Sequence, residues 1–324
     1  MVISDSLFAE YVDEIRGEKR WVVALSGGAD SLCLTLLAND YATKYGIKLY
    51  AGIVDHRLRP ESSEEILPII EILEANHIGY RVLVWHHDII NGSVEKKARE
   101  ARYDLLYDYC RKLNCKVLMT AHHALDQWET FFMRLVRGSA SKGLACMKSI
   151  SNFNGISLVR PFLEFNPYLI KHTLRNRFHV TKYLEDPSNK QCTFERVRWR
   201  GAYGDLSKKY SLSIKNVNKS IKRLQRATEV VDQLVEKTTS ELFDGKYIDI
   251  CKFRVLALEL KIRTLESIII SLRGLHIISY SLLERTACKI CVSSFTATNL
   301  CGLILKRDKN KNIKVTIENR KKSH

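Results

Sequence analysis

The fold of this chain is set close to its start by Trp21-Val22-Val23-Ala24-Leu25-Ser26-Gly27-Gly28-Ala29-Asp30-Ser31. An apolar run of strand-forming residues leads directly into a serine and two glycines, and a helix-period segment follows over residues 31–45. Because glycine has no Cβ, the backbone N–H groups of such a turn can approach an anion closely, and the dipole of the following helix attracts the same charge. The sequence therefore predicts a strand, a phosphate-binding turn and a helix, in that order.

Strand-like runs of this kind recur along the first half of the sequence. They cover residues 21–25, 49–54, 80–85 and 116–120, and helix-period segments lie between them at 31–45, 62–76 and 93–113. This cadence indicates right-handed βαβ units, so we predict an α/β fold with a doubly wound parallel sheet. Ligands of such sheets bind beyond the carboxyl ends of the strands, where the polar segments 26–31, 55–57, 86–88 and 122–129 all lie.

Two domains are expected from the length of 324 residues, because each part is long enough to bury its own core. After about residue 205 the alternation gives way to helix-period stretches at 212–242, 253–272 and 281–293, and then to a short hairpin-like segment at 300–317. Gly204 and the run Ser207-Lys208-Lys209 mark the change. We predict an α/β domain over residues 1–205 and a smaller, mainly helical domain over residues 206–324.

The net charge of +16 comes from the second half of the chain. Residues 1–150 contain 19 Lys and Arg against 20 Asp and Glu, whereas residues 151–324 contain 33 against 16. Clustered cations gain affinity for a polyanion by releasing the counterions of its phosphates, so the second half predicts a nucleic-acid partner. A solvated basic surface is the alternative.

The sequence predicts a cytoplasmic protein with reduced cysteines. No stretch reaches the roughly 18 uninterrupted apolar residues of a membrane span, and the acidic N-terminus lacks the pattern of a secretory signal. Nine cysteines, an odd number, are expected to be free thiols. Cys288, Cys291 and Cys301 could ligate a metal, but one close pair lacks the second pair of a zinc site, so buried, unligated thiols are expected.

Residues 26–31 read SGGADS and match the signature of the PP-loop ATP pyrophosphatases, which cleave ATP between its α and β phosphates. Unlike a Walker A loop, the turn has no lysine for the terminal phosphates. Further motifs make the chain resemble the tRNA(Ile)-lysidine synthases of that superfamily over nearly its whole length, in the short class without a second C-terminal domain. They are VDHRLRPES at 54–62, AREARY at 98–103, TAHHALDQWET at 120–130, RLVRGS at 134–139, and EDPSN at 185–189 followed by Arg196, Arg198 and Arg200.

The resemblance implies a ligase that joins lysine to C2 of the wobble cytidine in the CAU anticodon of tRNA(Ile). The reaction would pass through an adenylated tRNA and release diphosphate and AMP. ATP and Mg²⁺ are the implied cofactors, and tRNA(Ile) and L-lysine are the implied partners. A homodimer is an open alternative to a monomer.

The motifs supply expected site residues with separate roles. Asp30 is expected to contact Mg²⁺, because that ion prefers one or two carboxylates plus phosphate oxygens. Asp126 and Glu129, three apart on one helical face, are expected to hold the lysine ammonium while it loses a proton, and Arg196 is expected to join them in catalysis. ATP is expected on Ser26, Gly27, Gly28, Ala29, Asp30 and Ser31. The substrate or tRNA is expected on Asp55, His56, Arg99, Arg102, His122, His123, Arg198 and Arg200.

Structural interpretations of these residues stay open. His122 and His123 could cap the following helix or fill a polar pocket, and Arg99, Arg102 and Tyr103 could be packing and surface residues of an amphipathic helix. The alternation of Arg196, Arg198 and Arg200 suggests an extended or loop segment in which guanidinium groups bind phosphate or carboxylate, and surface charge is the alternative. Leu125 stands where the family pattern has an aspartate, so no role is assigned to it.

Three other functions are alternatives to a lysidine-forming ligase, and each makes a different prediction. A PP-loop cytidine thiolase would need a CxxC pair near the active site, but residues 93–113 contain only Cys110. A PP-loop small-molecule synthetase would leave the basic second half without a partner. A non-catalytic tRNA-binding protein would bind tRNA and release no diphosphate.

Overall fold

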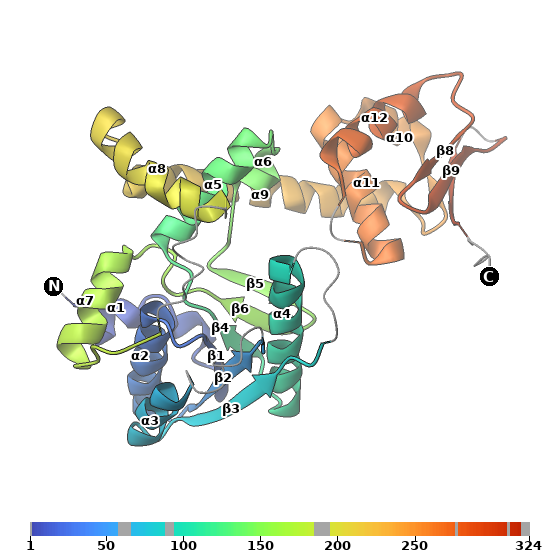
Figure 1. Ribbon diagram of the computed structural model, residues 1–324. Coiled ribbons are helices and arrows are strands. Elements are labelled where there is room, and N and C mark those ends of the chain that lie inside the picture. Colours follow the sequence, from blue (N-terminus) through green and yellow to red (C-terminus); the bar gives the residue numbers. More distant parts are fainter. Residues whose placement is uncertain are drawn as a thin grey trace. The chain divides into compact units, whose positions relative to one another are not determined.

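The computed structural model describes residues 2–57, 66–87, 94–184, 195–275, 278–309 and 312–318. The chain divides into two units, of which the first contains Met1–Arg137 and Cys146–Ile221 and the second Gly138–Ala145 and Lys222–His324. The colours of Figure 1 follow the chain through both. The division lies inside the helix α9 (Ile214–Leu242), and the domain boundary at 205/206 stays a prediction.

The first unit is built on a six-stranded sheet of order β3-β2-β1-β4-β6-β5. Only β5 runs antiparallel to its neighbour among the described strands of this sheet. Every residue of β1 after Arg20 is buried, as expected of a central parallel strand with helices on both faces. The strands are β1 (Arg20–Leu25), β2 (Lys48–Asp55), β3 (Gly79–Val84), β4 (Val117–Met119), β5 (Ile150–Phe153) and β6 (Ile156–Val159).

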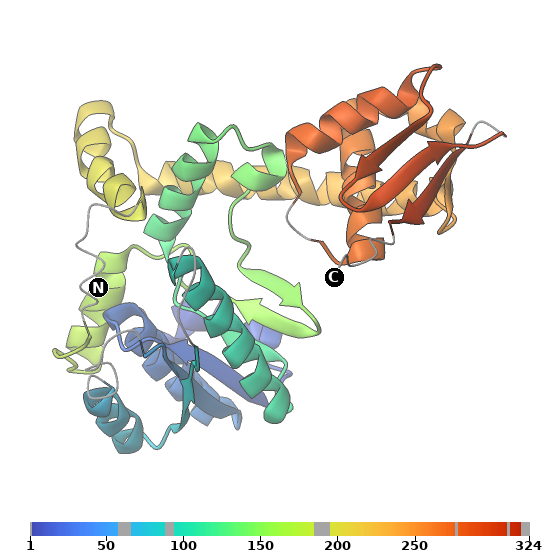
Figure 2. The same ribbon diagram turned by 45° about the vertical axis from the view of Figure 1, so that its right-hand side comes forward.

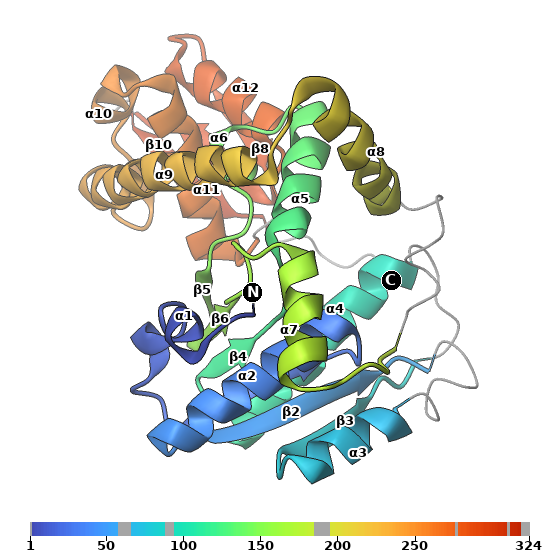
Figure 3. The ribbon, with the colours of Figure 1, turned by 90° about the vertical axis from the view of Figure 1, so that its left-hand side faces the viewer.

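Helices cover both faces of this sheet. The strand order reverses after β3, so α4 (Val94–Lys112) crosses the face opposite to α2 (Ala29–Tyr45) and α3 (Leu67–Ala75). α2 packs against α7 (Pro167–Arg177), as Figure 3 shows. The predicted doubly wound α/β fold is confirmed. The other described helices before α8 are α1 (Asp5–Ala9), the 3₁₀ turn η1 (Asp13–Ile15), α5 (Ala124–Val136) and α6 (Ser141–Leu144).

An aromatic cluster joins α5 to α8 (Glu195–Tyr210). The buried Trp128 ring lies 5.2 Å from that of Tyr203 and 6.1 Å from that of Trp199, in edge-to-face geometry that favours aromatic pairs. This packing makes residues 195–210 helical, so the extended segment predicted from the alternating arginines is wrong. Gly204 and Ser207, predicted to mark a boundary, lie inside α8.

The second unit combines helices with a small antiparallel sheet (Figure 2). Its sheet has the order β7-β10-β9-β8 and packs around buried Phe253, Ile262 and Leu303. The helical prediction is confirmed, but the predicted hairpin is part of four paired strands. The elements are α9, α10 (Ile250–Val255), α11 (Leu258–Arg273), α12 (Tyr280–Cys291), β7 (Tyr247–Ile248), β8 (Ala297–Leu300), β9 (Leu303–Arg307) and β10 (Ile313–Ile317).

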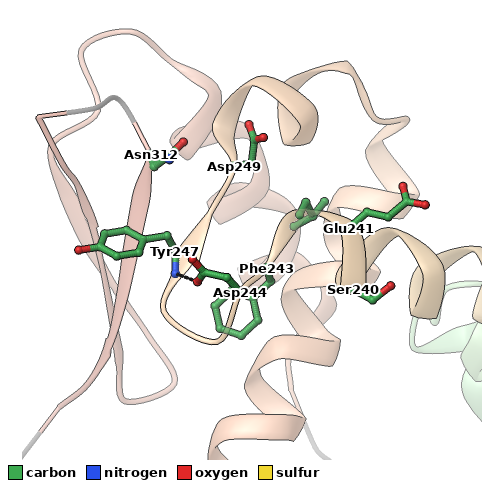
Figure 4. Close-up of a pocket in the computed structure, with 8 residues that line it drawn as sticks. Ser240, Glu241, Phe243, Asp244, Tyr247, Asp249 and Asn312 are labelled. Atoms are coloured by element: carbon green, nitrogen blue, oxygen red, sulfur yellow. Dashed lines mark hydrogen bonds between the residues drawn. The ribbon is translucent and has the colours of Figure 1, made fainter.

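A tight turn connects α9 to β7 in this unit, and α10 follows directly (Figure 4). Asp244 Oδ1 accepts hydrogen bonds from the backbone N–H groups of Lys246 at 2.8 Å and Tyr247 at 2.6 Å. Asp249 then caps α10 by accepting from the N–H groups of Cys251 and Lys252. Both carboxylates line a small pocket of about 190 Å³, where they accept hydrogen bonds from backbone N–H groups and so fix the turn and the start of α10.

None of the helices within the described ranges combines the length and the apolar composition that a bilayer crossing requires.

Candidate active site

The glycine turn joins β1 to α2, and hydrogen bonds of Ser26 and Ser31 stabilise it. Ser31 Oγ donates to the carbonyl of Gly28 at 2.9 Å and accepts from the N–H of Ser26 at 3.2 Å. Gly28 is the N-cap of α2 and makes no side-chain cap hydrogen bond, so the first-turn N–H groups are directed at the space beyond the strand. This geometry suits an anion.

Leu184 lies directly against the turn. Its N–H donates to the carbonyl of Gly27 at 3.0 Å. Gly27 has a φ of +81°, and a Cβ built on it would lie 2.5 Å from Leu184 Cδ1. The positive φ favours glycine at this position, and a side chain here would also force Leu184 to move. The motif at 185–189, which follows Leu184, lies outside the described residues, as do residues 58–62 of the motif after β2.

Asp30 stands at the mouth of the turn with a carboxylate that is only partly satisfied. Its Oδ1 is buried and has no hydrogen-bond partner within the described part of the chain, while Oδ2 lies 3.7 Å from His123 Nε2. Burial raises the pKa of Asp30, and the nearby Asp126 adds to this, whereas His123 opposes it. An unsatisfied oxygen beside a phosphate site fits a contact to Mg²⁺.

Arg200 of α8 connects the two carboxylates of α5. Its Nε donates to Glu129 Oε1 at 2.7 Å, and its Nη2 lies 3.6 Å from Asp126 Oδ1. Only 1% of the Glu129 side chain is exposed, and burial raises the pKa of Glu129 although Arg200 opposes the shift. Burial disfavours the charged form of Arg200, yet Glu129 raises the pKa of this guanidinium. The three groups form one ion-pair network, in which the carboxylates are shielded and the Arg200 side chain is 42% exposed.

The two histidines before α5 have different environments. His123 caps α5 in a reciprocal pair with Asp126, whose Oδ2 accepts from the His123 N–H at 2.9 Å. His122 Nδ1 lies 2.9 Å from Thr120 Oγ1. Burial lowers the pKa of His122 to about 3, so this imidazole is neutral at physiological pH. The capping interpretation is confirmed for His123.

A pocket of about 220 Å³ brings these elements together in the first unit. It lies beyond the carboxyl ends of β1 and β4, where the sequence placed the ligand. Residues from the turn, from α4 and from the start of α5 line it: Ala24, Ser26, Gly28, Asp30, Ser31, Arg99, Arg102, Tyr103, Thr120, Ala121, His122 and Asp126.

Four other predicted residues are not among those that line the pocket. Asp55 is buried at the end of β2, where its Oδ1 accepts from the Arg57 N–H at 2.9 Å, and His56 follows it. Arg196 is half-buried on the Arg200 face of α8 and helps to lower the pKa of Glu129 against the dominant effect of burial. Arg198 is exposed on another face, as helical rather than extended spacing requires.

Within the described ranges, no group of three or more His, Cys, Asp or Glu could hold a metal ion. Cys288 is exposed and Cys291 and Cys301 are half-buried, so the prediction of buried thiols is wrong for Cys288. A magnesium contact on Asp30 needs no such cluster, because phosphate oxygens supply the other ligands.

Comparison with known protein families identifies the first part of the chain. A family model described as a PP-loop domain matches residues 3–204. The chain belongs to the PP-loop family. Membership of this ATP-using family implies ATP binding, so the turn at 26–31 is the PP-loop turn.

Two curated relatives bear the name tRNA(Ile)-lysidine synthase. The protein of Wolbachia sp. subsp. Brugia malayi is 35% identical over 237 residues, which cover 70% of this chain and 54% of the relative. That of Wolbachia pipientis wMel is 38% identical over 182 residues, which cover 55% of this chain and 41% of the relative. The chain thus spans about half the length of these relatives.

One solved structure supports the PP-loop fold. It is the U34-tRNA thiolase NcsA from Methanococcus maripaludis, with its 4Fe–4S cluster, at a TM-score of 0.59 and 17% identity. The match covers 68% of this chain and 77% of that one. At this identity the likeness shows the fold alone.

The PP-loop site includes residues that the sequence did not single out. Leu184 packs on Gly27, and Lys171 of α7 adds a positive charge that helps to lower the pKa of Asp30 against the effect of burial. Thr120 orients His122. Leu184 and Lys171 lie far from the turn along the chain and carry no local motif, whereas Thr120 stands inside the motif at 120–130.

Proposed function

We propose that this chain ligates lysine to C2 of the wobble cytidine in the CAU anticodon of tRNA(Ile), forming lysidine from ATP. The relatives named above support this assignment. One structural observation carries it: the PP-loop turn, Asp30 and Asp126 face the same pocket. Such a pocket can hold a nucleotide's phosphates beside a carboxylate for a cationic second substrate.

In the first step the C2 oxygen of the cytidine attacks the α-phosphorus of ATP. A bond forms between that oxygen and phosphorus, and the bond from phosphorus to the bridging oxygen breaks, releasing diphosphate. The N–H groups at the start of α2 stabilise the negative charge that develops on the phosphoryl oxygens. Asp30, whose buried Oδ1 has no hydrogen-bond partner among the described residues, would hold Mg²⁺, which would supply Lewis-acid stabilisation of the phosphates.

In the second step the lysine amine attacks C2 of the adenylated cytidine. The new C–N bond replaces the C–O bond, AMP leaves with its electron pair, and the proton that the amine loses passes to the carboxylate of Asp126. Asp126 lines the pocket and is assigned to hold the incoming ammonium. Glu129 is buried against Arg200, so we assign it to fixing Arg200 rather than to touching lysine.

Arg200 limits the repulsion among the acidic groups of the site. Asp30, Asp126 and Glu129 would otherwise place three carboxylates near one pocket, and each would raise the pKa of the next. The guanidinium contacts Glu129 directly and lies near Asp126. Together with the stronger effect of His123, it lowers the pKa of Asp126 against burial and so helps to keep that carboxylate charged for the lysine ammonium, a role we assign to positioning.

The basic second unit is proposed to bind the tRNA body. Lys222, Arg223 and Arg226 are exposed on its part of α9. Each phosphate contact releases condensed counterions, which favours tRNA at moderate salt. Because ATP and tRNA are the substrates, we also infer a cytoplasmic location, and a homodimer stays a prediction.

The test is incubation with ATP, labelled lysine and a transcript of the CAU-anticodon tRNA(Ile), scored for label in RNA. Label should appear, and diphosphate should be released, only when the wobble base is cytidine. A transcript with uridine at that position is the control. Sulfur incorporation in place of lysine, or diphosphate release that ignores tRNA, would replace the proposal with a thiolase or a small-molecule synthetase.

An Asp30→Asn variant tests the proposed metal contact. Diphosphate release in the presence of tRNA and lysine should fall below detection, while tRNA affinity stays within a few-fold, because Asp30 lines the proposed nucleotide pocket and tRNA binding is assigned to the basic second unit. Unchanged turnover would remove Asp30 from the mechanism.

A further inference from the structure

The exposed side of α7 carries a basic stripe on the first unit, formed by Tyr168, Lys171, His172 and Arg175. Their spacing of three, four and seven residues from Tyr168 places these side chains on one side of the helix. All four are exposed, and Tyr168 is exposed to 82% although it is a large aromatic residue. The buried residues of α7 lie on the other side, and the helix packs against α2 (Figure 3). The stripe therefore belongs to the surface of the unit that holds the candidate active site.

No carboxylate balances the charge of this stripe. Residues 165–184 contain four Lys and Arg but no Asp or Glu. One of the four, Arg177, pairs with carboxylates of α1 and α2. Within the described ranges, the side chains of Lys171 and Arg175 make no ion pair and no hydrogen bond. Exposed cations without carboxylates suit a polyanion, because they gain affinity by releasing the counterions of its phosphates.

The stripe begins beside the candidate active site. The Ala124 N–H, at the start of α5, donates to the carbonyl of Phe165 at 3.1 Å, just before α7 begins. Burial raises the pKa of Asp30, and Lys171 lies near enough to that carboxyl to oppose the shift. Tyr168 lies one turn before Lys171, about 5 Å nearer the start of α7. The exposed aromatic ring is therefore at the end of the stripe next to the site.

We propose that the basic stripe of α7 is an RNA-binding face of the first unit, which holds the strand beside the reacting nucleotide. Lys171 and Arg175 contact phosphates, and the Tyr168 ring stacks on an unpaired base, as aromatic side chains do with single-stranded loops. An acidic protein would be attracted by the cations alone, whereas an exposed ring next to the site suits a base. The inference rests on the proposed function for the identity of the RNA.

The experiment compares a double variant, Lys171→Gln with Arg175→Gln, and the single variant Tyr168→Ala with a matched control. Arg111→Gln alters an exposed arginine in the last turn of α4, as Arg175 stands in the last turn of α7, so both changes remove a cation from a helix end. Arg111 does not line the pocket.

RNA affinity is measured by filter binding over a range of salt concentrations. The probes are the CAU-anticodon tRNA(Ile) and a short hairpin with its anticodon stem and loop. ATP affinity is measured by calorimetry without RNA, and thermal unfolding shows whether each variant is folded.

The double variant should bind both RNAs about ten-fold more weakly at moderate salt, with a salt slope shallower by about one unit per lost phosphate contact. Tyr168→Ala should weaken binding about five-fold and leave the slope unchanged, whereas Tyr168→Phe, which keeps the ring, should bind as the wild type does. ATP affinity should change no more than in Arg111→Gln, because the stripe does not line the pocket.

RNA affinities and salt slopes equal to those of Arg111→Gln would overturn the proposal and leave the stripe to an acidic partner or to solvent. RNA losses matched by equal losses of ATP affinity would also overturn it, because the substitutions would then act through the nucleotide site. A loss in the double variant without one in Tyr168→Ala would refute the stacking and keep the phosphate contacts.

Binding and catalysis give separate readouts. A wild-type protein that attaches no lysine to tRNA, but loses RNA affinity on substitution of the stripe, would refute the proposed function and keep the RNA-binding face. Lysidine formation by a protein whose RNA affinities these substitutions leave unchanged would do the reverse.

Discussion

Replacing Gly27 by alanine should damage the PP-loop turn through two separate effects. The φ of +81° costs a non-glycine residue about 1–2 kcal/mol. The new Cβ would lie 2.5 Å from Leu184 Cδ1, whereas carbon atoms pack at about 3.5–4.0 Å. Leu184 must therefore move by about 1 Å, at an overpacking cost of about 1–3 kcal/mol. The total loss of unfolding free energy should be about 2–5 kcal/mol.

Two further variants separate these effects. Gly46, the C-cap of α2, has a φ of +65° and nothing within 4 Å of its built Cβ, so Gly46→Ala should show the backbone cost alone. Leu184→Ala removes the side chain that the new methyl group meets. Gly27→Ala combined with Leu184→Ala should therefore be more stable than the sum of the single effects by about 1–3 kcal/mol.

Urea unfolding at 25 °C measures the free energy of unfolding of each variant. ATP-dependent diphosphate release measures the activity that depends on an intact PP-loop turn. Because a displacement of about 1 Å in a binding loop can reduce catalysis by about 100-fold, Gly27→Ala should be nearly inactive while remaining folded. If Gly27→Ala cost no more than Gly46→Ala, or if Leu184→Ala restored nothing, the argument from close packing would be wrong.

The remaining predictions concern the ion-pair network, His122 and the basic surface. Arg200→Met should lower the free energy of unfolding, measured in urea, by about 2 kcal/mol. This is less than the usual cost of breaking a buried ion pair, because the Arg200 side chain is 42% exposed. Adding Glu129→Gln should restore part of the lost stability, and additive effects of the two substitutions would contradict the pairing. The folded pKa of His122, about 3, lies below its ordinary 6.5, so the unfolded chain takes up the proton first as pH falls. Stability should drop by about 2 kcal/mol from pH 7 to pH 5, and His122→Gln should remove that loss; an unaltered pH dependence would refute it. Lys222→Glu with Arg223→Glu should reduce the salt slope of tRNA binding by about one unit per lost contact, and an unchanged slope would place the tRNA elsewhere.

The local sequence determined the elements of the first unit and the nature of its turn. The apolar run at 21–25 is buried because a central parallel strand has helices on both faces, and the glycines at 27 and 28 mark the phosphate turn through their missing side chains. Asp126 and Glu129 were placed on one face of a helix by their spacing, and α5 has them there. These properties depend on residues within a few positions of one another.

Only the tertiary structure decided which of these residues meet and what surrounds them. Alternation at 196–200 predicted an extended segment, but burial of Trp199 and Tyr203 against Trp128 outweighs that pattern and makes a helix. Because α5 and α8 pack together, Arg200 of α8 contacts Glu129 of α5, and Leu184 contacts Gly27 although the two lie more than 150 residues apart in the chain. Contacts between distant parts of a chain leave no periodic signal in either segment. Their physical cause is the shared burial of side chains, which appears only when the chain has folded.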